Sequence, residues 1–126
     1  MTQIYYPTLA DVAALARKIG APIRDLGLIE SALARPQTSV FGNDAYPDLF
    51  TKGAALLQSI VANHAFVDGN KRMGWVVAVT FLAVNGAVIS IDVDQDKAYQ
   101  LVISVADGSV RDVSATATEL RALFVG

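Results

Sequence analysis

The sequence predicts an all-α fold: one helical bundle that forms a single domain over residues 1–126. Hydrophobic residues make up 53% of the 126 residues, which is enough for a chain of this length to enclose one core. Apolar side chains recur every three or four positions through most of the chain, which is the spacing of amphipathic helices. The sequence has no linker, internal repeat or low-complexity stretch that would divide it into smaller units.

Two short helices are predicted in the first third of the chain. Thr8 and Asp11 have the spacing of a capping box, in which each side chain bonds the backbone N–H of the other residue, and Gly20 supplies a helix stop. The second helix, at residues 28–35, ends at Pro36 because proline lacks an N–H to donate and clashes with the preceding turn.

A loop and an amphipathic helix come next. Residues 37–47 contain many turn formers and predict a surface loop. Pro47 suits the first position of the following helix, and Asp48 suits its first turn, where the helix macrodipole favours a carboxylate. Apolar residues line one side of this helix, and Asp48, Lys52 and Ser59 are expected on the opposite, polar side.

The apolar stretch at residues 73–86 is predicted to be the central helix of the bundle. It is shorter than the roughly 20 residues that span a bilayer. Its β-branched and aromatic residues favour a strand locally, but its length favours a helix, and Asn85 with Gly86 provides a stop. A helix that is apolar on all sides belongs at the centre of a bundle.

The last part of the chain predicts one extended piece followed by two helices. The extended piece covers residues 87–91, and either Asp92 or Asp94 caps the helix after it. A turn at residues 107–108 separates this helix from the final one, which is expected at about residues 112–124.

The composition narrows the classes of partner and compartment. The formal net charge is −2, so there is no basic surface of the kind that binds nucleic acid or a membrane directly, and we expect neither partner. The chain has no cysteine, which excludes disulfides and thiolate-bound zinc. Together with the absence of a recognisable signal peptide, this leads us to expect a cytoplasmic protein.

The stretch HAFVDGNKR, residues 64–72, contains the densest group of polar side chains in the sequence. Gly69 lets the backbone approach a ligand closely. Lys71 and Arg72 fall at the start of the apolar helix, where their charge opposes the macrodipole unless an anion lies there. Phosphate suits this position best, because arginine offers a bidentate fork and lysine a compact charge.

The same stretch carries a histidine, a carboxylate and an aromatic residue. Asp68 beside an anion is a reasonable ligand for Mg²⁺ bridging phosphate oxygens, and His64 is a candidate proton acceptor. Phe66 is expected to be buried and to pin the loop to the core. Together these residues predict phosphoryl or nucleotidyl transfer. The simpler alternative is a solvated turn with a hydrogen-bonded histidine, which leaves the two cations unexplained.

HAFVDGNKR resembles the signature of the Fic/Doc family, specifically the Doc (death on curing) branch of toxins. Residues 23–37 and 46–72 resemble the two blocks of the family that surround this signature. The resemblance implies a Fic-fold helical bundle with the signature loop between two central helices. Lys71 stands where AMP-transferring Fic enzymes carry glycine, and Trp75 stands where they carry a second arginine. For the Doc branch this implies ATP bound in the reversed sense and transfer of its γ-phosphate.

The resemblance also implies partners and roles for individual residues. The target is a threonine of elongation factor Tu, whose phosphorylation arrests translation, and the inhibitor is a Phd-like antitoxin segment that folds on binding. AMP transfer and a catalytically idle antitoxin-binding module remain alternatives. The roles implied are the base for His64, the Mg²⁺ ligand for Asp68, the anion-binding loop for Gly69 and Asn70, and the ATP triphosphate contacts for Lys71 and Arg72.

A few other polar and aromatic residues have two possible interpretations. Asp25 is most simply an N-cap, whereas Arg24 is either a surface charge or a contact to the substrate or nucleotide. Arg35 is expected on a solvated helix face. Tyr46 and Trp75 are expected to pack at the core or its rim, although an aromatic side chain near the site can stack on adenine.

Overall fold

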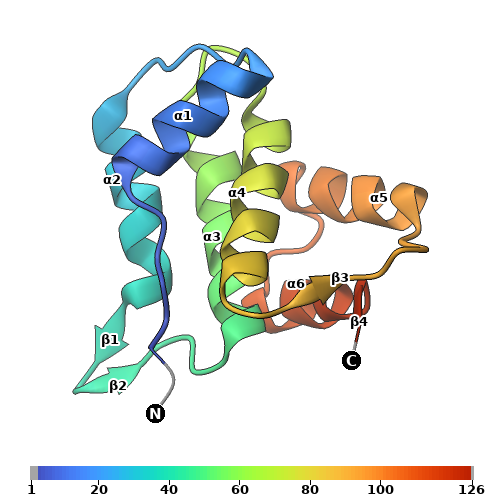
Figure 1. Ribbon diagram of the computed structural model, residues 1–126. Coiled ribbons are helices and arrows are strands. Elements are labelled where there is room, and N and C mark those ends of the chain that lie inside the picture. The colour runs from blue at the N-terminus through green and yellow to red at the C-terminus, as the bar shows by residue number, and fades with distance from the viewer. Residues whose placement is uncertain (1–2, 126) are drawn as a thin grey trace.

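The computed structural model describes residues 3–125 and confirms the all-α fold class (Figure 1). Residues 1, 2 and 126 of the predicted domain lie outside the described residues. The elements are α1 (Leu9–Ile19), α2 (Leu26–Ala34), the 3-10 helix η1 (Arg35–Gln37), β1 (Ser39–Val40), β2 (Asn43–Asp44), α3 (Leu49–Asn63), α4 (Asn70–Val84), β3 (Val88–Ile89), α5 (Gln95–Ala106), α6 (Val113–Arg121) and β4 (Phe124–Val125).

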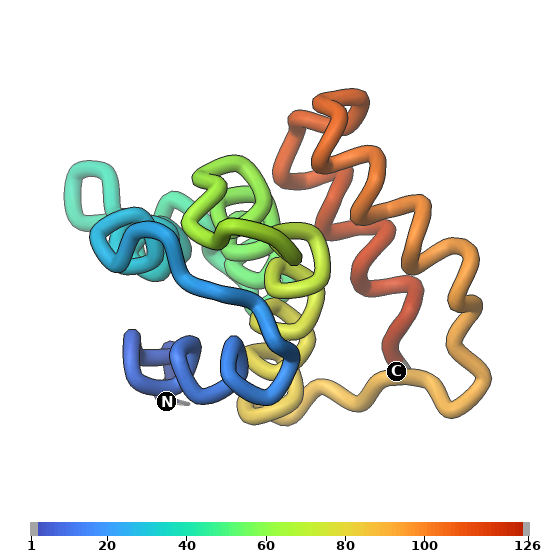
Figure 2. The backbone as a smooth tube through the Cα atoms, turned by 90° about the horizontal axis from the view of Figure 1, so that it is seen from above, coloured from blue at the N-terminus to red at the C-terminus, as the bar shows by residue number. Residues whose placement is uncertain are grey.

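Helix α3 lies at the centre of the bundle, in contact with α2, α4, α5 and α6. Seen from above, α1 and α2 lie on one side of α3 and α4, and α5 and α6 lie on the other (Figure 2). Every residue from Lys52 to Val61 is buried. Helix α4 lies beside α3 between the two outer groups of helices, but α3, and not α4 as predicted, is the most buried helix of the bundle. One side of α4 is buried, and Thr80, Ala83 and Val84 are exposed.

Two residues of α3 that were expected on its polar, solvent-facing side are buried instead. Lys52 is 4% exposed, and its ammonium forms an ion pair with Asp44 at 3.1 Å and donates to the carbonyl of Tyr46. The hydroxyl of Ser59 lies 3.1 Å from the carbonyl of Ala32 on α2. Each polar group thus has a partner, which is the condition for burying it at acceptable cost.

Most helix ends follow the predicted chemistry. Thr8 and Asp11 form the capping box of α1, Gly20 ends that helix in the left-handed conformation, and Asp25 caps α2. One detail differs: Asp48 is the N-cap of α3, so Pro47 precedes the helix instead of opening it. As N-cap, the carboxylate of Asp48 accepts from the backbone N–H of Thr51 at 2.9 Å, which stabilises the helix more than a carboxylate inside its first turn.

Two segments carry more order than the sequence predicts. The loop at residues 37–47 contains the antiparallel pair β1–β2, which turns at Phe41 and Gly42 and lies at the opposite end of α3 from His64 (Figure 1). The extended piece after α4 pairs with β4, and for this reason α6 ends at Arg121 and not near residue 124. No helix within residues 3–125 has both the length and the apolar character needed to cross a bilayer.

Candidate active site

The segment between α3 and α4 is tied to the segment between α1 and α2. Ile23 pairs with Phe66 in an isolated antiparallel β-bridge, and the amide of Val67 donates to the carbonyl of Pro22 at 2.8 Å. The side chain of Phe66 is 2% exposed, which confirms that it anchors the loop in the core. The loop therefore has a fixed conformation at the end of the central helix pair.

Two further side chains close this loop. The amide group of Asn70 donates to the carbonyl of Phe66 at 3.0 Å and accepts from its N–H at 3.1 Å. The carboxylate of Asp68 accepts from the N–H of Gly69 at 2.9 Å. Gly69 has a φ of 85°, a left-handed conformation that glycine adopts without the steric cost of a Cβ atom. Asn70 thus holds the loop in shape through its side chain.

His64 is the C-cap of α3 and has a left-handed backbone, with φ 51° and ψ 46°. This conformation is uncommon for a residue other than glycine, and a neighbouring side chain holds it. Nε of Arg24 donates to the carbonyl of His64 at 3.0 Å, and its Nη2 donates to the same oxygen. Arg24 therefore positions the His64 backbone, a contact that neither of its two sequence interpretations included.

The N-terminus of α4 is the uncapped, cationic end of a helix that is buried on one side. Among the six α-helices of residues 3–125, α4 alone has no side-chain hydrogen bond at its N-cap. Its first internal bond runs from the N–H of Met73 to the carbonyl of Gly69. Lys71 and Arg72 are exposed in this first turn and form no ion pair with any described residue. Free N–H groups and two cations are the features that can receive an anion at a helix N-terminus.

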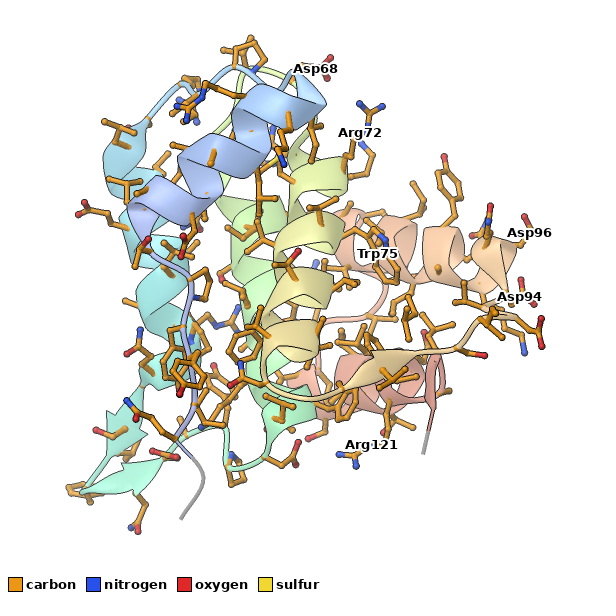
Figure 3. All side chains as sticks on the ribbon, viewed as in Figure 1. Asp68, Arg72, Trp75, Asp94, Asp96 and Arg121 are labelled. Carbon is orange, nitrogen blue, oxygen red and sulfur yellow. The ribbon has the colours of Figure 1, made fainter. Side chains whose placement is uncertain are left out.

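These groups meet at one end of a cleft of about 880 Å³ between α4 and α5. Figure 3 shows Asp68 and Arg72 at the upper end of α4, and Trp75 below Arg72 on the side of α5. Arg24 does not line the cleft, since its guanidinium lies against the loop backbone. The predicted site residues that line it are His64, Asp68, Gly69, Asn70, Lys71 and Arg72.

A magnesium ion fits the donors at this end of the cleft. Oδ2 of Asp68 has no hydrogen-bond partner among residues 3–125, and the side chain is exposed to the cleft. Within the described residues no three His, Cys, Asp or Glu side chains gather into a metal-binding group. Asp68 thus suits an ion that takes one carboxylate from the protein and its other ligands from phosphate and water, as Mg²⁺ does at nucleotide sites.

The structure also places residues that the sequence left open or assigned elsewhere. Trp75 lines the cleft, whereas the hydroxyl of Tyr46 accepts from Nε of Arg35 at 3.1 Å, away from it. Arg35 is half-buried, so the expectation of a solvated face is wrong for this residue. The cleft wall formed by α5 was not predicted, because α5 carries no sequence motif. The one feature of its sequence that could have indicated a binding surface is the aromatic residue Tyr99, which is exposed in the structure and lines the cleft.

Replacing Arg24 with glutamine should disturb His64 without unfolding the protein. The variant loses two charge-assisted bonds to the His64 carbonyl, at a cost of about 1 kcal/mol in the free energy of unfolding. His64 is the only histidine of the chain, so its imidazole gives a single set of ring proton signals in NMR. We expect these signals to shift or broaden in R24Q and to stay unchanged in R17Q, which removes an exposed arginine of α1. Identical His64 signals in R24Q and the unmodified protein would contradict the positioning role.

Comparison with known proteins agrees with this geometry. The family model for the Fic/DOC family matches residues 3–82, which include α1, α2, α3 and the entire loop from His64 to Gly69. A protein named Toxin Doc from Mycolicibacterium smegmatis is 51% identical over 98 residues, which are 78% of this chain and 75% of that protein. On the strength of both matches, the chain belongs to the Fic/Doc family.

Proposed function

We propose that the chain is the toxin of a toxin–antitoxin module and transfers the γ-phosphate of ATP to a serine or threonine hydroxyl of elongation factor Tu. The observation that carries the proposal is the uncapped N-terminus of α4, with Lys71 and Arg72 in its first turn and His64 at the same end of the cleft. The similarity to a protein named Toxin Doc supports the toxin role and an antitoxin as partner, which we propose to be Phd-like.

In this proposal, the first turn of α4 binds the triphosphate. The free N–H groups and the macrodipole attract phosphate oxygens, and Arg72 and Lys71 add charge-assisted hydrogen bonds. Gly69 adopts its left-handed backbone without strain, and a Cβ atom there would lie 3.3 Å from Cβ of Ala21, which also lines the cleft. Mg²⁺ bound beside Asp68 would supply positive charge that offsets the charge on the phosphate oxygens.

His64 acts as the general base in the transfer. Its imidazole takes the proton from the target hydroxyl, and the hydroxyl oxygen forms a bond to the γ-phosphorus. The bond from that phosphorus to the bridging oxygen breaks, and ADP leaves with the electron pair. Arg24 donates to the backbone carbonyl of His64 and so fixes the position of this residue. The imidazole is thereby held near the position that proton transfer requires.

AMP transfer is the rival within the same family. It would use the same base and the same anion site, but the α-phosphorus would be attacked and pyrophosphate would leave. Lys71 favours phosphate transfer, because this position is glycine in the AMP-transferring members that the sequence resembles. The resemblance to the Doc branch implies that a lysine at this place obstructs the pocket that holds the α-phosphate in the AMP-transferring members.

Labelled ATP separates the two reactions. The protein, elongation factor Tu and Mg²⁺ are incubated with ATP labelled at either the α- or the γ-phosphate, and the label on elongation factor Tu is measured. We expect label from the γ-position only, and we expect prior addition of the antitoxin to abolish it. Label from the α-position would establish AMP transfer instead, and absence of label from both would contradict this target.

A further inference from the structure

The tip of the β1–β2 hairpin carries the most exposed large apolar side chain of residues 3–125. Phe41 is 100% exposed, and Val40 beside it is 52% exposed. Phe41 has a left-handed backbone with a φ of 52°, and Gly42 follows with a φ of 81°. Two positive φ angles in a two-residue turn indicate a type I′ turn, whose first position is usually asparagine, aspartate or glycine. Phenylalanine here strains the backbone and gains nothing from burial within the chain.

The hairpin is held against α2 and α3 by polar contacts at its base. Lys52 on α3 forms an ion pair with Asp44 of β2 at 3.1 Å and donates to the carbonyl of Tyr46. The hydroxyl of Tyr46 accepts from Nε of Arg35 at 3.1 Å. Because these contacts fix the hairpin, its tip loses little conformational entropy when it binds a partner.

A groove of about 350 Å³ lies between α2 and α3 and reaches the base of this hairpin. The residues that line it include Asn63, which precedes His64, and Thr38, which precedes β1. The other lining residues are small, except for Arg35. This half-buried arginine forms no ion pair with any described residue, although its Nη2 donates to Gln58 at 3.3 Å. The groove therefore contains a cation that lacks a carboxylate, and an anion there would offset its loss of water.

We propose that the hairpin tip and this groove form a docking surface for the protein that receives the phosphate, and that this protein presents an apolar pocket for Phe41 and a carboxylate for Arg35. The inference rests on the proposed function, since it takes the acceptor to be a protein. Helix α3 has 15 residues and is about 22 Å long, and the hairpin and His64 lie at its two ends (Figure 1). One small molecule cannot contact both, whereas a folded protein spans this distance.

The chemistry of the surface favours a protein over a nucleic acid. A nucleic acid takes several cations along its backbone, whereas the groove offers Arg35 alone. Asp44, the carboxylate of the hairpin, is already paired with Lys52 and does not compete for Arg35. An aromatic side chain that enters a pocket, next to a charge pair with arginine, is the usual centre of a protein–protein interface.

A variant of Phe41 separates a binding role from a structural one. Phe41→Asn places asparagine before Gly42, the favoured pair for a type I′ turn, and should raise the midpoint of thermal unfolding. The same variant should raise the Kd for elongation factor Tu, measured by calorimetry, about tenfold. Its KM for this substrate should rise as well, while kcat and the Kd for Mg-ATP stay unchanged. A residue kept only for the fold would lower the unfolding midpoint when replaced, and its loss would leave the Kd unchanged.

The matched control is an apolar residue that is exposed elsewhere. Ile91 is 95% exposed and follows β3, on the α5 side of the molecule (Figure 1). Ile91→Asn removes a similar apolar side chain and should bind elongation factor Tu like the unmodified protein. If it weakens binding as much as Phe41→Asn does, the effect is not specific to the hairpin and the inference is wrong.

A carboxylate supplied by the chain itself tests the role of Arg35. Ser31 is exposed in the groove wall and precedes Arg35 by four positions, the spacing at which glutamate pairs with arginine on a helix. Ser31→Glu should therefore occupy Arg35, raise the Kd for elongation factor Tu about tenfold and leave the unfolding midpoint equal or higher. Ser31→Gln has the same size without the charge and should keep the original Kd. Equal binding by the two variants would contradict a carboxylate in the groove.

The outcomes separate the inference from the function on which it rests. If elongation factor Tu accepts the γ-phosphate while Phe41→Asn and Ser31→Glu leave Kd and KM unchanged, the target docks elsewhere and the proposed function stands. If elongation factor Tu neither binds nor accepts label, the proposed function and the inference both fail. If Phe41→Asn weakens the binding of an antitoxin peptide and not that of elongation factor Tu, the antitoxin covers the hairpin, which also overturns the inference.

Discussion

Replacing His64 with alanine is expected to lower the rate of phosphoryl transfer by about 10²–10⁴-fold, the usual contribution of a general base. The imidazole is exposed, and the hydrogen bonds that fix the loop run through other groups, namely the His64 carbonyl and the side chain of Asn70. The protein should therefore stay folded. The rate is measured as transfer of γ-label to elongation factor Tu, and folding is checked by thermal unfolding.

Two comparisons make this prediction specific. Histidine and alanine both carry a backbone cost of roughly 1–2 kcal/mol at a φ of about 50°, whereas glycine adopts that conformation freely. His64→Gly should therefore be at least as stable as His64→Ala, and equally inactive. Full transfer activity in His64→Gly would contradict a role for the imidazole. Growth arrest that persists in both variants would point instead to a module that acts through binding alone.

Replacing Gly74 with leucine is expected to cost about 3 kcal/mol in the free energy of unfolding, at the upper end of the usual cost of overpacking. Gly74 lies on α4 where it meets α3, and a Cβ atom there would be 2.6 Å from Cγ2 of Val61 and 3.3 Å from Cδ1 of Leu57. Because Val61 is branched at Cβ and buried, it cannot move aside easily. Urea unfolding of the two proteins measures the difference.

A glycine in an exposed part of another helix provides the control. A Cβ atom at Gly27 on α2 would meet only Oδ1 of Asp25, at 3.3 Å, an oxygen on an exposed side chain that also accepts from the N–H of Leu28. Gly27→Leu should change the free energy of unfolding by no more than about 1 kcal/mol, because the better helix propensity of leucine offsets a small displacement of this cap. If Gly74→Leu is as stable as Gly27→Leu, the close contact between α3 and α4 does not limit this position.

The close packing of α3 against α4 at Gly74 also affects the geometry of the candidate active site. Helices α3 and α4 carry the two ends of the loop, so their separation sets where His64 lies relative to Arg72. A larger residue at position 74 that pushes the helices apart is therefore expected to lower activity as well as stability. The activity loss should exceed the fraction of unfolded protein, because the folded fraction itself has a misplaced base.

The parts of the structure that follow from local chemistry could be predicted from the sequence. The capping box of Thr8 and Asp11 and the left-handed Gly20 depend only on residues within one helix end. The motif at residues 64–72 is contiguous, so its side chains share one loop whatever the rest of the chain does. For the same reason, six of the residues singled out from the sequence do line one cleft.

The parts that depend on distant residues could not be predicted in this way. The polar pattern of α3 indicated a solvent-facing side, but Lys52 and Ser59 find partners in β2 and α2, which a periodicity cannot show. Arg24 acts through the backbone carbonyl of His64, 40 residues away in the sequence. Because every residue has a backbone carbonyl, no pattern of side chains could have identified this partner. The α5 wall consists of ordinary helix residues, and only the fold brings Tyr99 to the cleft.

Amide NMR of the isotopically labelled protein, titrated with Mg-ATP, tests most directly whether phosphate binds at the start of α4. The free N–H groups of Asn70, Lys71 and Arg72 should show the largest chemical-shift changes, with Gly69 beside them. Amides of the β1–β2 hairpin, at the far end of α3, should stay unchanged. If Mg-ATP binds and the signals of residues 69–72 do not move, the nucleotide lies elsewhere, and the proposed role of the helix terminus is wrong.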